Sequence, residues 1–228
     1  MNYQIIKNTG ELINFIEWLP DLSESERFYV ALFARKKYAP DSGLKNDKCQ
    51  LKRFLATKEN LILKLQQLEL SLGYYSYDGL EIPQESLAVY ITPNPRCLQK
   101  AVRKLGKTCW NIVDLPKVNP VAEAMTCVHQ SKSRTIIMDF DVDNKENLTE
   151  DIGKLNEIIG SDSFTILETR GGYHIMVNPK MASAFREHHN FNKNWYGVIM
   201  EEFKPDVTGD NLIPIPGCTQ GNYIPILI

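Results

Sequence analysis

The stretch Ile136–Asp143, which reads IIMDFDVD, decides the fold, because an apolar run here delivers a carboxylate at every second position. Such a run predicts a β-strand, in which successive side chains alternate between the two faces. The aspartates Asp139, Asp141 and Asp143 then share one face, and the apolar residues between them share the other. Carboxylates held this close repel one another unless a divalent cation lies between them, and hard oxygen ligands suit Mg²⁺ or Mn²⁺.

The three aspartates differ in their sequence context. Asp143 is followed by Asn144 and Lys145, so it is equally consistent with the start of a polar loop. Asp139 lies inside the apolar run, where a strand that emerges into solvent does not explain it. We therefore predict Asp139 and Asp141 as ligands of a divalent cation and place Asp143 in the loop.

A second motif, Thr169–His174, reads TRGGYH and separates two predicted strands, 163–168 and 173–177. The two glycines allow unusual backbone conformations and leave amide hydrogens accessible, so such a turn can bind phosphate oxygens. Arg170 and His174 flank the turn and could both donate to a triphosphate. An ordinary Gly-Gly hairpin is the alternative, but the position after an acidic strand and one helix favours phosphate binding.

A third carboxylate is needed for two-metal phosphoryl transfer, and two residues compete for the role. Asp206 precedes the segment Val207–Gly209, and Asp210 follows it. Thr208-Gly209-Asp210 also has the composition of a plain turn. We therefore favour Asp206 and leave Asp210 open.

The segments around these motifs alternate between strand and helix patterns. We expect strands at 87–92, 136–142, 163–168 and 173–177, and further apolar segments at 212–215 and 223–228. We expect helices from Pro95 to Gly106 with Asn94 as N-cap, at 120–131, at 148–160, and to about Phe203. This order predicts an α+β fold, with helices packed on one face of a mostly antiparallel sheet.

Residues 10–72 have mostly helical patterns. One apolar stripe runs from Leu12 to Leu19, and a second covers Phe28–Ala34 after the capping-box pattern Ser23–Glu26. A third helix is expected from Thr57 to about Gly73. The chain therefore divides, by prediction, into a mainly helical region at 1–86 that packs on a core at 87–228.

The helix expected after Pro95 has one strongly basic face. Its apolar positions are Leu98, Ala101, Val102 and Leu105, and the opposite side carries Arg96, Lys100, Arg103, Lys104 and Lys107. Five cations with no anion could follow a nucleic-acid backbone, although a lysine-rich solvated face remains the alternative. A second basic bias occurs within residues 35–64.

Bulk composition excludes several classes of protein. The chain has 228 residues, 43% hydrophobic and 24% charged, with a formal net charge of −2, so it is not a polycation that coats DNA. Its five cysteines form no CxxC pair, which argues against a zinc ribbon or a disulfide framework. No signal peptide or membrane span is evident, so we expect a cytoplasmic protein with no membrane partner.

The order of the motifs resembles the archaeo-eukaryotic primase superfamily, the primase-polymerases, over about residues 87–228. Asp139-Phe140-Asp141 is similar to that family's acidic motif, and Gly172-Tyr173-His174 to its histidine motif. Asp206 is similar to the isolated third aspartate, and Pro216–Thr219 to the Pro-Gly-Thr that follows it. The basic residue common before Pro-Gly is missing, and so is the zinc module of many primases.

The resemblance implies an RRM-like catalytic core in which Asp139, Asp141 and Asp206 hold Mg²⁺ or Mn²⁺ and are the catalytic carboxylates. It implies that His174, with Arg170 and Gly172, contacts the triphosphate of an incoming nucleotide. Arg96 would be a further nucleotide contact. The basic residues expected to bind nucleic acid are Lys100, Arg103, Lys104 and Lys107.

The expected function is that of a DNA primase or primase-polymerase. Such an enzyme is a template-dependent nucleotidyltransferase that uses two divalent metals to join nucleoside triphosphates on single-stranded DNA. Its partners would be the template and the triphosphates, with a helicase or other replication protein left open. Two alternatives remain: a metal-dependent nuclease, and a non-catalytic module that binds single-stranded nucleic acid.

Overall fold

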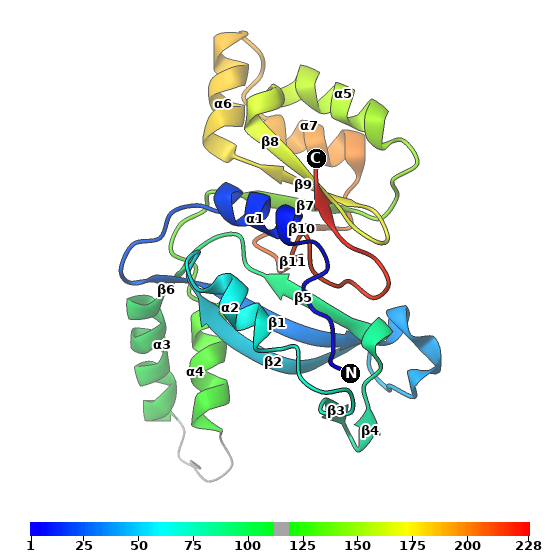
Figure 1. Cartoon of the computed structure of the whole chain (residues 1–228). Helices are drawn as coiled ribbons and strands as arrows, with labels where there is room; N and C mark the ends of the chain where they lie inside the picture. Colours follow the sequence, from blue (N-terminus) through cyan, green and yellow to red (C-terminus); the bar gives the residue numbers. More distant parts are fainter. Residues whose placement is uncertain (112–118) are drawn as a thin grey trace.

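The computed structural model describes residues 1–111 and 119–228, without the side chains of 109–111. Its strands form two five-stranded sheets and one short hairpin, and helices pack against both sheets. The two larger sheets lie one above the other in Figure 1. The α+β class predicted from the sequence is therefore confirmed.

The lower sheet of Figure 1, here called the first sheet, is antiparallel and takes most of its strands from the N-terminal half. Its order is β11 (Ile213–Pro214), β5 (Leu87–Ile91), β1 (Glu26–Arg35) and β2 (Lys48–Ala56), and β6 (Arg96–Cys97) also pairs with β1. A separate hairpin joins β3 (Ser76–Tyr77) to β4 (Leu80–Glu81).

The helix predicted over Phe28–Ala34 is wrong, because this segment is the long strand β1. Alternate residues such as Val30 and Leu32 enter one core, and Tyr29 and Ala31 between them are buried on the other face. A strand covered on both faces has a continuous apolar run, which periodicity cannot distinguish from a buried helix. One capping-box contact does form, since Ser23 N donates to Glu26 Oε2, but it precedes a strand.

The mainly helical character predicted for 1–86 is therefore wrong. The described helices of that region are α1 (Thr9–Trp18), α2 (Leu61–Gln66) and the 3₁₀ turns η1 (Lys36–Tyr38), η2 (Pro40–Ser42) and η3 (Gln84–Ser86). The helix expected from Thr57 to Gly73 is thus reduced to α2. Because β1 pairs with β5, one sheet also spans the predicted boundary at residue 86.

The second sheet contains the aspartate strand. Its antiparallel order is β10 (Val207–Gly209), β7 (Met138–Val142), β9 (Tyr173–Val177), β8 (Phe164–Glu168) and β12 (Ile226–Leu227). The chain runs β7–helix–β8–β9–helices–β10, which is a split β-α-β arrangement. The strands predicted at 136–142, 163–168 and 173–177 are confirmed within a few residues.

Helices cover one face of the second sheet (Figure 1). They are α5 (Leu148–Ile159), α6 (Pro179–His188) and α7 (Trp195–Phe203), with the 3₁₀ turn η5 (Ser161–Ser163) after α5. Their core includes Phe140 of β7 and Tyr173 and Ile175 of β9. The opposite face of this sheet, with the aspartates, therefore points away from these helices.

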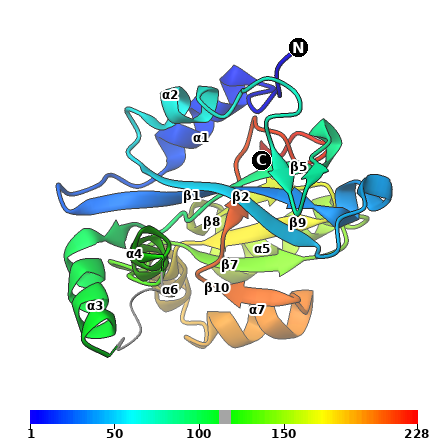
Figure 2. The same ribbon diagram turned by 90° about the horizontal axis from the view of Figure 1, so that it is seen from below.

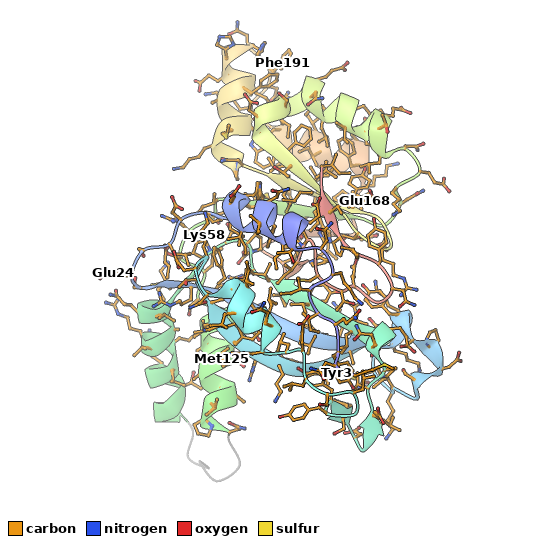
Figure 3. All side chains as sticks on the ribbon, in the orientation of Figure 1. Tyr3, Glu24, Lys58, Met125, Glu168 and Phe191 are labelled. Carbon is orange, nitrogen blue, oxygen red and sulfur yellow. The ribbon has the colours of Figure 1, made fainter. Side chains whose placement is uncertain are left out.

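A second hydrophobic core holds the two sheets together. It combines α1 and α2 with β1, and it also takes in Leu167 of β8 and Met176 of β9. Trp18 at the end of α1 donates from Nε1 to Thr165 Oγ1 of β8 at 3.1 Å. Figure 3 shows side chains filling the space between the sheets, and Figure 2 shows α1 and α2 on one side of the first sheet, with α3 (Leu98–Asn111) and α4 (Pro120–His129) on the other.

The Pro-Gly turn closes this arrangement between β11 and β12. Gly217 has a φ of +76°, and a Cβ there would lie 2.3 Å from the carbonyl oxygen of Asn8. The amides of Lys7 and Asn8 both donate to Gly217 O. The turn thus packs on the segment that starts α1, which explains its glycine without any ligand.

Leu32→Ala tests the strand assignment of 26–35. Leu32 is fully buried at the centre of β1, so its loss should lower the free energy of unfolding by about 2–5 kcal/mol. The matched control is Leu63→Ala, because Leu63 of α2 is 58% exposed and should change stability by about 0.5 kcal/mol or less. Equal effects in denaturant unfolding would contradict the burial of β1.

Candidate functional site

The candidate site is a cavity of about 270 Å³ between the aspartate face of the second sheet and the first sheet. Three strands of the second sheet line it through Asp139, Asp141, His174 and Val207. Lys48 comes from β2 and His129 from the end of α4, and the remaining wall is the segment 210–212 that links β10 to β11. Residues from both halves of the sequence therefore meet here.

The pairing of β7 with β9 places a histidine between the two predicted metal ligands. His174 lies opposite Asp141 in the antiparallel register, so both side chains share a face. His174 Nδ1 is 2.8 Å from Asp139 Oδ1, and Nε2 is 3.6 Å from Asp141 Oδ1. A carboxylate only accepts hydrogen bonds, so Nδ1 carries a proton.

The electrostatics of this group follow from its burial. Burial opposes a charged imidazole, but the charge and hydrogen bond of Asp139, with the charge of Asp141, outweigh it and raise the pKa of His174. Burial also raises the pKa of Asp141, and the negative charge of Asp139 adds to this while His174 opposes it. Asp139 is 1% exposed, whereas the Asp141 side chain is 32% exposed and faces the cavity.

Asp210, rather than Asp206, lies on the cavity wall. Gly209 pairs with Asp139 across β10 and β7, so the chain leaves the sheet beside Asp139 and delivers Asp210 there. Asp206 is one residue out of phase with this face, and its exposed carboxyl lies by Asp143, whose hydrogen bond and charge raise the pKa of Asp206. The structure thus brings Asp210, and not Asp206, to the cavity that Asp139 and Asp141 line.

Asn94 is not the N-cap predicted from the sequence, because α3 begins only at Leu98. It is fully buried and links three segments. Its Nδ2 donates to Ile137 O at 2.7 Å and to Asp210 Oδ1 at 2.9 Å, and its Oδ1 accepts from the amides of Ile136 and Ile137. Asn94 therefore ties the end of β5 to the start of β7 and to the cavity wall.

Arg96 is likewise internal. Its side chain is 2% exposed, and Nη1 lies 2.5 Å from Asp210 Oδ2. The predicted contact of Arg96 with a nucleotide is therefore not open in this structure, where its partner is a carboxylate of the protein.

Arg170 and His174, which flank the glycine turn, contact different residues of the protein. Arg170 is exposed, and its guanidinium lies 4.8 Å from the centre of the Tyr38 ring. Gly172 donates to Thr169 Oγ1 at 3.3 Å, so its amide already has a partner. A Cβ at Gly172 would lie 1.9 Å from Val142 O, whereas one at Gly171 would meet nothing. Close packing on the end of β7 thus explains Gly172.

The sequence reasoning missed a basic and aromatic wall supplied by β1, η1 and β2. Lys48 pairs with Arg35 across the strands, and both line a small cavity that adjoins the site. Arg35 contacts Asp47 at 2.8 Å and Tyr90 Oη at 2.6 Å. Lys37 lies near enough for its charge to act on Asp141. The basic bias of residues 35–64 was the available signal.

The basic face of α3 is partly committed to the protein itself. Lys100 donates to the carbonyls of Lys132 and Ser133, and Lys104 to Gln130 Oε1. Arg103 and Lys107 are exposed, with no ion pair to the described residues. Val102, predicted to face the core, is 68% exposed.

The donor set of the cavity fits a hard cation only after rearrangement. Its carboxylate oxygens suit Mg²⁺ or Mn²⁺, and Asp141 has the least complete set of hydrogen-bond partners. Within 1–111 and 119–228, however, no three acidic, histidine or cysteine side chains stand close enough together to hold a metal as they are. None of the described helices is long and apolar enough to cross a bilayer.

Comparisons with known proteins found no relative of this chain. No family model matches the chain, no curated protein matches it, and no solved structure matches it.

The adjacent glycines of the turn provide a matched test of their roles. Gly172→Ala should lower the free energy of unfolding by at least about 2 kcal/mol, because its Cβ would overlap Val142 O. Gly171→Ala should stay within about 1 kcal/mol of wild type, since a Cβ there meets open space. A stable Gly172→Ala protein that has lost only ligand binding would instead support a direct phosphate contact.

The His174 pKa predicts how stability depends on pH in metal-free protein. The folded-state pKa lies above the unfolded value of about 6.5, so the imidazolium stabilises fully below that pH. This stabilisation is lost as pH rises through the folded pKa. In chelator-treated samples, the free energy of unfolding of wild type should therefore exceed that of His174→Gln most below about pH 6. The difference should become progressively smaller above that pH. A stability difference that grows with pH would contradict the charged pair.

Proposed function

We propose that this protein is a template-dependent nucleotidyltransferase of the primase-polymerase type, which joins nucleoside triphosphates on single-stranded DNA with Mg²⁺ or Mn²⁺. One observation carries the proposal. His174 lies between Asp139 and Asp141 on paired strands, and Lys48 lines the same cavity. Carboxylates suit the cation, and basic residues suit a triphosphate.

The topology supports the same proposal. The sheet order β10-β7-β9-β8, with helical segments after β7 and after β9, is the arrangement expected of the RRM-like core that the primase resemblance implies. The acidic motif lies on the first strand of that unit and the histidine on the third. The sequence order of the motifs and their spatial grouping therefore favour one function.

The cation would be held by Asp139, Asp141 and Asp210. When bound, it lowers the pKa of the attacking hydroxyl and neutralises charge on the phosphoryl group that is transferred. Asp141 needs no new conformation for this role, because its carboxylate already faces the cavity. Asp139 and Asp210 would exchange hydrogen bonds from protein donors for the cation.

The chain's own cations would hold the triphosphate. Lys48 lines the cavity, and the charge of Lys37 on η1 reaches Asp141, whereas Arg35 beside them is already held by Asp47 and Tyr90. Arg170 extends the same wall from the glycine turn, over Tyr38. His174 would contribute a hydrogen bond from the carboxylate side. Such a wall distinguishes a polymerase from the rival nuclease, because a cleaved backbone phosphate needs fewer cations than a triphosphate.

The template would contact a second basic region on α3, which follows β6 beside the start of β1, whereas Arg35 and Lys48 lie at the other end of that strand. Arg103 and Lys107 of α3 remain exposed for contact with the DNA backbone, whereas Lys100 and Lys104 are engaged with the protein. A helicase or other replication protein is a compatible partner, and no feature of the described surface selects one.

Incorporation of labelled nucleotides on a single-stranded template with Mn²⁺ tests the proposal. Asp141→Asn should lower incorporation by about a hundredfold or more, because the charge that would face the cation is lost. Asp210→Asn should have a comparable effect. The matched control is Asp206→Asn, which should stay within about threefold of wild type, because Asp206 lies with Asp143 outside the cavity.

Two other outcomes would decide against polymerisation. Shortened template without incorporation, lost in Asp141→Asn, would favour the nuclease. Template binding with neither activity would favour a non-catalytic module. A larger loss in Asp206→Asn than in Asp210→Asn would restore Asp206 as the third carboxylate.

A further inference from the structure

Arg96 is a buried cation with an incomplete set of partners. Its side chain is 2% exposed, and of its guanidinium nitrogens only Nη1 has a partner, Asp210. Nε and Nη2 are buried and have no hydrogen-bond partner among the described residues. Buried polar groups are normally hydrogen-bonded, so an arginine left in this state calls for a role other than stability.

Its partner Asp210 is held on both oxygens. Oδ2 contacts Arg96 Nη1 at 2.5 Å, and Oδ1 accepts from Asn94 Nδ2 at 2.9 Å. Asp139 is held in the same way, by His174 on Oδ1 and by Asn211 Nδ2 on Oδ2 at 3.2 Å. Protein donors thus occupy the positions that a cation would need on two of the three carboxylates.

Arg96 and Asp210 differ in how firmly the backbone holds them. Arg96 lies on β6, where it pairs with Arg27 of β1 and forms a bridge to Lys132 on its other side. Asp210 lies in the link between β10 and β11, and its side chain is 19% exposed at the cavity. When the pair separates, the carboxylate is therefore the group that moves.

We propose that Arg96 is a positioning residue that acts as the internal counter-ion of Asp210 and competes with a divalent cation for its carboxylate. This inference rests on the proposed function. A guanidinium does not lose its proton in proteins, so the competing charge is permanent. Arg96 holds Asp210 at the wall while the cavity contains no cation. A cation that binds must overcome the attraction between Arg96 and Asp210, and it is itself repelled by the charge of Arg96.

Arg96 contacts Asp210 through one nitrogen only and leaves two nitrogens unpaired, which suits a pair that must open. A counter-ion that binds Asp210 with one nitrogen can release it by a small rotation of the carboxylate, whereas a bidentate pair would be harder to open. Asn94 retains its hydrogen bonds to Ile136 and Ile137, the two residues that precede β7, during such a rotation. The start of the aspartate strand therefore stays in place.

Binding of Mn²⁺ alone, measured by the loss of the free-ion electron paramagnetic resonance signal, tests the inference. Arg96→Met should bind Mn²⁺ roughly tenfold more tightly than wild type, because a positive charge a few ångströms away is removed. Arg96→Lys keeps the charge and should bind within about twofold of wild type. Equal or weaker binding by Arg96→Met would overturn the inference while leaving the metal site in place.

Absence of Mn²⁺ binding in both wild type and Arg96→Met would overturn the proposed metal site together with the inference. Thermal unfolding of metal-free protein provides a second measurement if Arg96→Met folds poorly. Asp210→Asn should have a lower melting temperature than wild type, because it leaves Arg96 buried without a counter-ion. The double variant Arg96→Met/Asp210→Asn should recover part of that loss. A double variant less stable than Asp210→Asn would overturn the counter-ion role.

Discussion

The site depends on the register of β7 against its two neighbours. His174 of β9 stands opposite Asp141, and Gly209 of β10 stands opposite Asp139. One imidazole therefore lies close to both carboxylates, and the glycine, which has no side chain, leaves space beside them. A slip of one residue would turn the aspartates toward the apolar helices and Phe140 toward the cavity. The burial of Phe140 in the helix-covered core opposes that slip.

Compensation of buried negative charge explains why distant segments converge on this face. Asp139 is satisfied by His174 and Asn211, and Asp210 by Arg96 and Asn94. Each of these donors lies on a different segment from the carboxylate it serves. An isolated buried carboxylate would be costly, so the packing of the two sheets and the charge balance of the cavity support each other.

Much of the second sheet could be predicted from local pattern. The alternation at 138–142 and the glycine turn are short-range signals, and the structure has the corresponding elements. The first sheet could not be predicted in this way. β1 is buried on both faces, so its hydrophobic run has no period of two, and it resembles a buried helix. The partners that make it a strand, β2 and β5, lie 13 and 52 residues beyond its end.

The sequence by itself determined the candidate carboxylates Asp139 and Asp141, the histidine of the glycine turn and the α+β class, because each follows from neighbouring residues. Only the tertiary structure decided that Asp210 rather than Asp206 reaches the cavity, that Arg96 is internal, and that Lys48 faces the aspartates. These depend on strand register and on the approach of two sheets. Both are set by contacts between residues far apart in the chain, to which local composition and periodicity are insensitive.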